Sequence, residues 1–322
     1  MLPRMSDMTL AEKDPSVGLL HRAWMDPYPV AVGPDPYVAR ERQRLAGLTW
    51  EHFDVRPVAA CIGAEIVGVD ITSDLAGPVV AELRRALCDY KVVFFRGQPL
   101  TAEQHVRFGR RFGDLEVHPF IPPSPDTPEL VRFEKSAEVG GYENSWHHDV
   151  TWRERPSMGA ILHAIQVPAV GGDTLWADMY AAYEGLGDEL RARVDGMDAV
   201  HDFMRSFGRS VPEDQRAAMR DRFPMVQHPV APTHAETGRT HLYVNRNFVD
   251  HIVGVDADES TALIDRLARM ADYPEYQCRW HWEPDDVAFW DNRAAQHYAS
   301  SDYWPEIRVM ERASVVGSRP AR

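Results

Sequence analysis

The sequence has few cysteines and no long hydrophobic run. Its 322 residues include three cysteines, Cys61, Cys88 and Cys278, which lie far apart. An odd number without metal-type spacing excludes a disulfide framework and a cysteine-based zinc site, and is typical of a reducing compartment. No stretch approaches the roughly 18 apolar residues of a membrane helix. The first residues lack the apolar core of a signal peptide. We therefore expect a cytoplasmic protein that is not embedded in a membrane.

Positive charge is also scarce. The chain has 35 Lys and Arg against 49 Asp and Glu, a formal net charge of −14, and no basic cluster. This balance argues against nucleic-acid and anionic-membrane partners. A small anionic substrate stays compatible with it, because a local arginine pocket can oppose the overall field.

The chain divides near residue 48. The segment "WMDPYPVAVGPDPYVARERQRL" contains four prolines and no sustained period. We expect residues 1–48 to form a flexible extension or an arm that lies over the domain or a partner subunit. Residues 49–322 contain no internal repeat or low-complexity linker, which favours a single catalytic domain.

Hydrophobic periodicity predicts a mixed secondary structure. Helices are expected over 77–90, after the capping box of Thr101 and Gln104, and over 256–271. Short apolar strands are expected at 91–97, 158–167, 241–249, 286–292 and 307–316. Short strands without a regular βαβ rhythm indicate a mainly β fold, an antiparallel sandwich or barrel with flanking helices.

The segment "WHHDV" contains the first candidate metal ligands. In an extended chain, residues i and i+2 share a face, so His147 and Asp149 point together and His148 points away. The sequence holds a rival pair, His281 and Glu283 in "RWHWEPDD". We interpret that pair as a solvated strand face, because it adjoins a turn-forming segment.

A metal site needs a third ligand, and a cosubstrate needs its own partners. Two histidines and one carboxylate form the facial triad of non-haem Fe(II) oxygenases. His297, in "WDNRAAQHYA", is a candidate for the third position. Arg308, Met310 and Arg312 share one face of the following strand. Surface arginines are the alternative, but Met310 between them favours an inward face that binds carboxylate or sulfonate.

At this point the residues resemble the Fe(II)- and 2-oxoglutarate-dependent dioxygenases of the taurine dioxygenase (TauD/TfdA) family, over roughly residues 52–318. The motifs that carry the resemblance are "GAEIVGVD", "KVVFFRGQ", "RFGDLEVHP", "WHHDVTW", "GGDTLWADMYAAYE", "HDFMRSF", "WDNRAAQHYA" and "RVMERASVVG". The resemblance implies a double-stranded β-helix, or jelly roll, with helices outside. It also implies Fe(II), 2-oxoglutarate and O2 as cofactor and cosubstrates, and a homo-oligomer such as a dimer or tetramer.

The resemblance further assigns roles to individual residues. It places iron on His147, Asp149 and His297, and 2-oxoglutarate against Thr174 and Arg308. The substrate's anionic group is expected at Arg312 and His118. The expected pocket-lining positions are Val150, Trp152, Phe207 and Phe248.

Three positions depart from the family's taurine enzymes. Ile121 stands for a tyrosine, Glu143 for an asparagine, and Trp152 for a phenylalanine. A bulkier indole shortens the pocket, and Glu143 is expected near its mouth, where it could attract an amine. These departures put taurine itself in doubt.

The predicted reaction is hydroxylation of a small anionic molecule, coupled to conversion of 2-oxoglutarate to succinate and CO2. A taurine-like sulfonate, an alkyl sulfate ester, an aryloxyalkanoate and an amino-acid-like substrate all remain open. Two alternatives from other classes are a zinc hydrolase, since two histidines and a carboxylate also suit Zn²⁺, and a jelly-roll binding protein. Neither explains Arg308 at this offset from His297.

Overall fold

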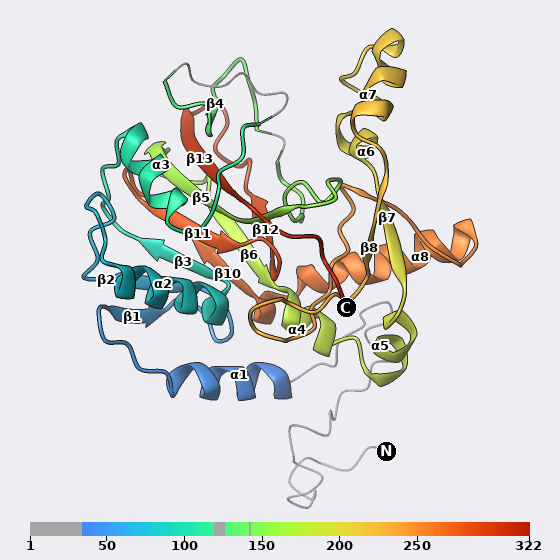
Figure 1. Cartoon of the computed structure of the whole chain (residues 1–322), viewed down its shortest axis with the longest axis horizontal. Coiled ribbons are helices and arrows are strands. Elements are labelled where there is room, and N and C mark those ends of the chain that lie inside the picture. Colours follow the sequence, from blue (N-terminus) through green and yellow to red (C-terminus); the bar gives the residue numbers. More distant parts are fainter. Residues whose placement is uncertain (1–33, 119–125, 142) are drawn as a thin grey trace, which may run out of the picture.

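A computed structural model describes residues 34–118, 126–141 and 143–322 of the chain (Figure 1). A mixed, mostly antiparallel sheet of seven strands forms its centre, in the order β1-β2-β3-β11-β5-β13-β4. Its strands are β1 (Asp54–Pro57), β2 (Ala64–Val67), β3 (Val92–Phe95), β11 (Val287–Asp291), β5 (Ser157–Gln166), β13 (Arg308–Val316) and β4 (Leu130–Lys135). Only the β2–β3 pair is parallel among the strand pairs of the described residues.

Two smaller antiparallel sheets complete the β structure. One has the order β10-β6-β12, formed by β10 (Gln277–Trp280), β6 (Thr174–Asp178) and β12 (Ala295–Ala299). The other has the order β8-β7-β9, formed by β8 (Val226–Pro229), β7 (Asp198–His201) and β9 (Val249–Ile252). The β10-β6-β12 sheet carries His297 and Thr174 and so supplies one wall of the candidate site.

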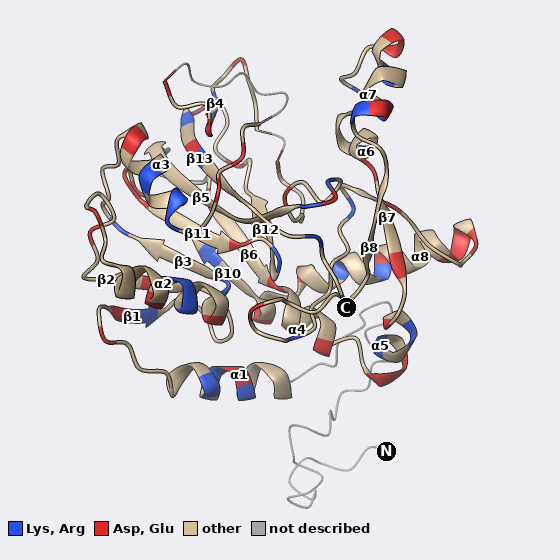
Figure 2. Cartoon of the chain, in the orientation of Figure 1, with Lys and Arg blue, Asp and Glu red and all other residues tan. Residues whose placement is uncertain are grey.

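Helices surround the sheets, and α6 and α7 extend furthest from them (Figure 1). The α-helices are α1 (Pro36–Ala46), α2 (Gly77–Tyr90), α3 (Ala102–Arg110), α4 (Met179–Glu184), α5 (Asp188–Val194), α6 (Phe203–Phe207), α7 (Arg216–Arg222) and α8 (Ala257–Ala268). Acidic and basic residues are interspersed along α1 and α2 (Figure 2). Of the helices in the described part of the chain, none is both long and apolar enough to cross a bilayer.

Local sequence signals account for most of these elements. The capping box predicted at Thr101 and Gln104 is formed, with each side chain accepting a hydrogen bond from the other residue's backbone N–H. The helix over 77–90 and the strands at 92–95, 157–166, 287–291 and 308–316 match the sequence prediction. The expectation of short-stranded sheets with flanking helices is confirmed, but β structure does not dominate, because the α-helices of the described part contain slightly more residues than its strands.

The strand predicted over 241–249 is largely wrong. Only Val249 belongs to a strand, β9. The backbone of 241–243 instead bonds to two separate segments: His241 N to Pro232 O and Tyr243 N to Val230 O on one side, and Leu242 N to Met179 O on the other. The consecutive apolar residues 242–244 are buried in a connection between elements, and a short apolar run alone does not distinguish such a connection from a strand in a ladder.

Residues 36–46, which the sequence placed in an extension, form α1 and pack on the domain. The Lys91 ammonium is fully buried and pairs with Glu41 of α1 at 2.7 Å and with Asp178 at 3.2 Å. Tyr37 also donates to Asp178, at 3.1 Å. The segment 34–48 is therefore continuous with the domain, and the boundary at residue 48 stays a prediction.

Lys91→Met is expected to lower the free energy of unfolding by about 3–5 kcal/mol, because it removes the buried cation of Asp178 and leaves Glu41 paired only with Arg44 and Arg239. Urea unfolding followed by circular dichroism measures the loss. Arg42→Met, on the exposed side of α1, is the control and should change stability by less than about 0.5 kcal/mol. A similar small change for both variants would contradict a role for this ion pair in fixing α1.

Candidate functional site

The three predicted ligands come together. His147 lies opposite His297 in an isolated antiparallel bridge, with the two backbone N–H···O bonds at 3.1 and 2.9 Å. One ring nitrogen of each histidine and one Asp149 carboxylate oxygen all lie within 4.8 Å of one another. The structure therefore brings the three predicted residues together, and their role as metal ligands stays a prediction.

Neighbouring groups orient the cluster. His147 Nδ1 donates to Ser145 O at 2.7 Å, so its Nε2 carries the lone pair. The Asp149 backbone is held by Asn292, whose Oδ1 accepts from Asp149 N at 2.7 Å and whose Nδ2 donates to Asp149 O at 3.0 Å. Val150 follows with φ of +48°, a turn that ends the extended segment. His148 points away and packs against Tyr243, as the alternation predicts.

The electrostatics prepare these groups to bind a cation. Burial alone would raise the Asp149 pKa, but the Arg312 guanidinium and the two histidines lower it to about 2. Arg312 Nη1 donates to both Asp149 oxygens, at 3.0 and 2.9 Å. Burial and the neighbouring His147 lower the His297 pKa to about 3. At neutral pH the cluster therefore presents a carboxylate and a neutral His297 imidazole.

A cavity opens beside this cluster. Its lining residues are Phe133, Lys135, Glu143, His147, Leu162, Thr174, Trp290, His297, Ala299, Arg308, Met310 and Arg312. The prediction that Arg308, Met310 and Arg312 face inward together is confirmed. The remaining walls are mostly apolar, so the cavity combines a few charged groups with a hydrophobic body.

Arg308 is the most unusual of the charged groups. It is buried, with Nε donating to Gly172 O at 3.1 Å and Nη2 to Thr174 Oγ1 at 3.3 Å. Among the described residues no carboxylate lies within ion-pairing distance of it, and burial lowers its pKa. Thr174 Oγ1 also accepts from Trp282 Nε1 at 3.0 Å, so its own proton can be donated to a ligand. A buried guanidinium needs an anion, and the cavity is where one can bind.

Lys135 is a cavity residue that the sequence analysis missed. Its ammonium pairs with Glu143 at 2.7 Å, so Glu143 does not present a free charge to an amine. Glu143 lines the cavity, as expected, and its attraction of a substrate amine stays a prediction. The signal was present in "LVRFEK", where alternation places Phe133 and Lys135 on one face. The register then pairs Lys135 with Arg308 and Phe133 with Met310, a partnership that no local pattern reveals.

Other predicted substrate contacts lie away from the cavity lining. Val150, Trp152 and Phe248 are buried in a cluster with Phe203, and Trp152 meets the Phe203 ring edge-on at 5.0 Å. Phe207 stacks on Phe203 and is 38% exposed. None of these four residues lines the mapped cavity, so their contact with the substrate stays a prediction.

His118 is half-buried near Arg312. Burial and the Arg312 and Arg153 guanidinium groups together lower its pKa to about 4. It is outside the mapped cavity lining, and its role in anion binding stays a prediction. Ile121 lies outside the described residues.

The rival pair in "RWHWEPDD" is solvated, as the sequence interpretation held. His281 is 55% exposed and its Nδ1 lies 2.8 Å from Asp173 Oδ1. Glu283 is 68% exposed. Neither belongs to a metal-ligand group in the described part of the chain.

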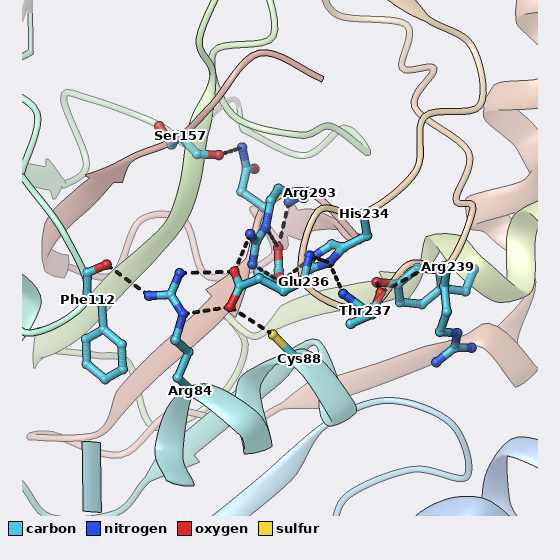
Figure 3. Close-up of polar contacts among 12 residues, drawn as sticks. Arg84, Cys88, Phe112, Ser157, His234, Glu236, Thr237, Arg239 and Arg293 are labelled. Carbon is cyan, nitrogen blue, oxygen red and sulfur yellow. Dashed lines mark hydrogen bonds and ion pairs between the residues drawn. The ribbon is translucent and has the colours of Figure 1, made fainter. Parts of the chain in front are cut away.

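A second buried group, Cys88, His234 and Asp291, has metal-like spacing but its polar atoms are already partnered (Figure 3). His234 Nε2 donates to Asp291 at 2.9 Å, and His234 Nδ1 accepts from two backbone N–H groups. Arg293 donates to both Asp291 oxygens, at 2.8 and 2.7 Å. Glu236 links Arg293 to Arg84. This is a saturated ion-pair network.

The Asp291 network makes stability depend on pH. Burial alone would raise the Asp291 pKa, but Arg293 and His234 hold it well below its ordinary value. A depressed folded-state pKa gives stability that is complete above the unfolded pKa of about 4 and is lost as pH falls below it.

Asp291→Asn is therefore expected to cost about 3–5 kcal/mol at pH 7, with a smaller difference from wild type at pH 4 and below. Melting temperatures of the variant and of wild type, measured from pH 7 to pH 3.5, test this expectation. Asp221→Asn, on the exposed α7, is the control. A difference that stays constant over this range would mean that the Asp291 charge does not stabilise the fold.

Comparison with known proteins gives one consistent result. Residues 54–314 match the model of a family described as "Taurine catabolism dioxygenase TauD, TfdA family". An alpha-ketoglutarate-dependent sulfate ester dioxygenase of Pseudomonas putida is 36% identical over 276 residues, which cover 83% of this chain and 91% of the relative. An alkylsulfatase of Acinetobacter baylyi is 34% identical and covers 83% of this chain and 86% of the relative. The crystal structure of a putative alpha-ketoglutarate-dependent taurine dioxygenase from Burkholderia xenovorans matches with a TM-score of 0.74 and 37% identity, over 83% of this chain and 94% of that one.

Proposed function

Because the chain belongs to the TauD/TfdA family of 2-oxoglutarate-dependent dioxygenases, we propose that it oxidises a small alkyl sulfate ester or sulfonate at a site built on His147, Asp149 and His297. Fe(II) is the proposed metal, and 2-oxoglutarate and O2 are the cosubstrates. The family membership favours this reaction over the zinc hydrolase and the binding protein.

The donor set fits Fe(II). Two imidazoles and one carboxylate on one side of the ion leave three positions open, as non-haem Fe(II) oxygenases require. Asp149 is ionised at neutral pH, and the Ser145 carbonyl fixes the tautomer of His147 that presents Nε2. When bound, iron and 2-oxoglutarate supply the activation of O2 that hydroxylates a substrate carbon.

The observation that carries the proposal is the buried Arg308, which has no carboxylate partner among the described residues. Arg308 and Thr174 line the same cavity as His147 and His297, and the Arg308 guanidinium donates to the Thr174 hydroxyl. A dicarboxylate bound at the metal through its keto-acid end would place its far carboxylate at Arg308. Bidentate carboxylate binding is what an arginine side chain does best.

Charge in the cavity favours a monoanionic substrate. Its cations are Lys135, Arg308 and Arg312, and the carboxylates are Glu143 and the adjacent Asp149. One positive charge is left over. Divalent iron adds two and doubly anionic 2-oxoglutarate removes two, so one positive charge remains for the substrate.

The identity of that substrate follows from Lys135 and the apolar walls. Because Lys135 neutralises Glu143, the cavity offers no free carboxylate to the amine of taurine among its described lining residues. Phe133, Leu162 and Met310 instead suit an alkyl chain. These features favour an alkyl sulfate, and the sulfate ester dioxygenase and alkylsulfatase relatives point the same way.

The reaction then balances simply. Hydroxylation of the carbon that bears the sulfate ester gives a product that collapses to an aldehyde and sulfate, while 2-oxoglutarate becomes succinate and CO2. Arg308 holds the cosubstrate, Arg312 binds the substrate's anionic group with His118 nearby, and the apolar walls exclude water.

Three further assignments belong to this proposal. The seven-stranded sheet and the β10-β6-β12 sheet correspond to the two halves of a double-stranded β-helix. The protein forms a dimer or tetramer, which sedimentation analysis tests. It acts in the cytoplasm as a single catalytic domain.

An anaerobic titration tests the function. Adding Fe(II) and 2-oxoglutarate to the apo-protein should give a visible charge-transfer band that neither gives alone. Alkyl sulfates should shift this band, and exposure to O2 should then release aldehyde, sulfate and succinate in equal amounts. Taurine serves as the comparison compound and should shift it less.

Two results would contradict the proposal. A folded protein that binds Fe(II) but gives no band with 2-oxoglutarate would remove the cosubstrate assignment. Sulfate release that yields an alcohol and needs no O2 would identify a hydrolase, and Zn²⁺ would then be tested as the metal.

A further inference from the structure

A second group of potential metal ligands lies on the opposite face of the main sheet. On β13, Arg308, Met310 and Arg312 face the cavity, whereas Glu311 faces the other way. On β5, Leu162 lines the cavity and His163 is paired with Glu311 on the outer face. Helix α3 packs against β13 on this outer face (Figure 1) and contributes a fully buried His105.

Three of the four ring nitrogens of His105 and His163 are buried without a hydrogen bond to the described residues. His105 Nε2 donates to Ile161 O at 3.1 Å, so His105 Nδ1 carries the lone pair, and it has no hydrogen-bond partner among the described residues. Both ring nitrogens of His163 are buried without a hydrogen bond in the same part of the chain. The carboxylate nearest to them is Asp285, whose Oδ1 lies 3.4 Å from His163 Nε2. A buried ring nitrogen whose lone pair has no hydrogen-bond donor lowers the stability of the fold unless a ligand binds it.

We propose that His105, His163 and Glu311 form a second metal site, for a divalent transition metal of the zinc type, which ties α3 to the outer face of the main sheet. One ligand atom from each of the three residues lies within 4.8 Å of the others. Two imidazoles and a carboxylate suit Zn²⁺. An imidazole whose N–H binds a backbone carbonyl is the arrangement that orients a metal-bound histidine. The site is separate from the triad and does not depend on the proposed function.

The surrounding charges are compatible with a divalent cation. Burial lowers the pKa of both histidines, that of His105 to about 3, so both rings are neutral at neutral pH. Glu311 pairs with Arg132 at 3.0 Å, so a metal competes with that guanidinium. Asp285 is half-exposed and can serve as a fourth ligand or as the hydrogen-bond partner of His163. Glu311 and Asp285 also give the ion a path from solvent.

Zinc binding in a variant without the triad tests the proposal. The double variant Asp149→Ala, His297→Ala removes the first site, and Zn²⁺ is titrated against a chromogenic chelator. One Zn²⁺ per chain should bind, and zinc at a hundred times its Kd should raise Tm by about 5 °C. Adding Glu311→Gln should weaken this binding by more than about 100-fold, beyond the effect of losing an outer partner of a metal ligand. His163→Gln is a second test, and His281→Gln, an exposed histidine, is the matched control.

The other outcomes overturn the site. These outcomes are that the folded triad variant binds no zinc, that zinc binding survives Glu311→Gln, or that His281→Gln weakens zinc binding as much as Glu311→Gln does. Glu311 is partly exposed, so its variant is expected to fold even where His163→Gln does not. Cobalt(II) absorption in the triad variant gives an independent readout, because bands of a four-coordinate ion should appear and should disappear with Glu311→Gln.

Discussion

Asp149→Ala is expected to lower Fe(II) affinity by more than about 100-fold and to abolish 2-oxoglutarate turnover. Loss of an outer partner of a metal ligand already costs 10- to 100-fold, and Asp149 supplies the only charge of the triad. The change also removes the carboxylate that holds Arg312. Iron binding by anaerobic titration and succinate release are the measurements.

His281→Ala is the matched control for this prediction, because it removes a histidine from the rival H-x-E unit. It should leave iron binding and turnover within about twofold of wild type. Wild-type iron affinity in Asp149→Ala would mean that the triad is not the metal site. Loss of iron binding in His281→Ala would instead indicate that the rival pair, His281 and Glu283, binds the metal.

Arg308→Met is expected to raise the KM for 2-oxoglutarate by at least about 30-fold and to leave the KM for the sulfate ester nearly unchanged. Truncating one partner of a buried charge pair costs about 2–5 kcal/mol, and 1.4 kcal/mol is tenfold. Turnover should recover at saturating 2-oxoglutarate, because Arg308 does not contact the triad.

Arg308→Met is expected to weaken 2-oxoglutarate binding without destabilising the protein. Arg308 is a buried cation without a carboxylate partner among the described residues, so methionine should leave the apo-protein's Tm unchanged or raise it. Arg56→Met, on the exposed strand β1, is the control for both measurements. A rise in the KM for the sulfate ester alone would assign Arg308 to the substrate and not to the cosubstrate.

The sequence predicted most where the signal is short-range. Alternation in "WHHDV" separated His147 and Asp149 from His148, because side-chain direction in an extended segment depends only on position. The capping box at Thr101 formed for a similar reason, since its two hydrogen bonds span three residues. Residue types and motif order also pointed to the family that the comparisons confirm.

The sequence predicted least where two distant segments meet. The strand predicted over 241–249 is wrong because a short apolar run does not distinguish a ladder from a buried connection. The sequence placed residues 36–46 in an extension, because the Lys91 ammonium that pairs with Glu41 is 50 residues away along the chain.

By itself, the sequence determined the reaction chemistry, because a facial triad depends on residue types and on a few fixed spacings. The tertiary structure alone decided which charges in the cavity are free. Cross-strand register sets Lys135 beside Arg308, and a loop brings Glu143 to Lys135. The α3 helix places His105 behind the sheet, near His163 and Glu311. These contacts join residues far apart in the chain, and a charge is neutralised or left unpaired only when packing fixes its distance to a partner.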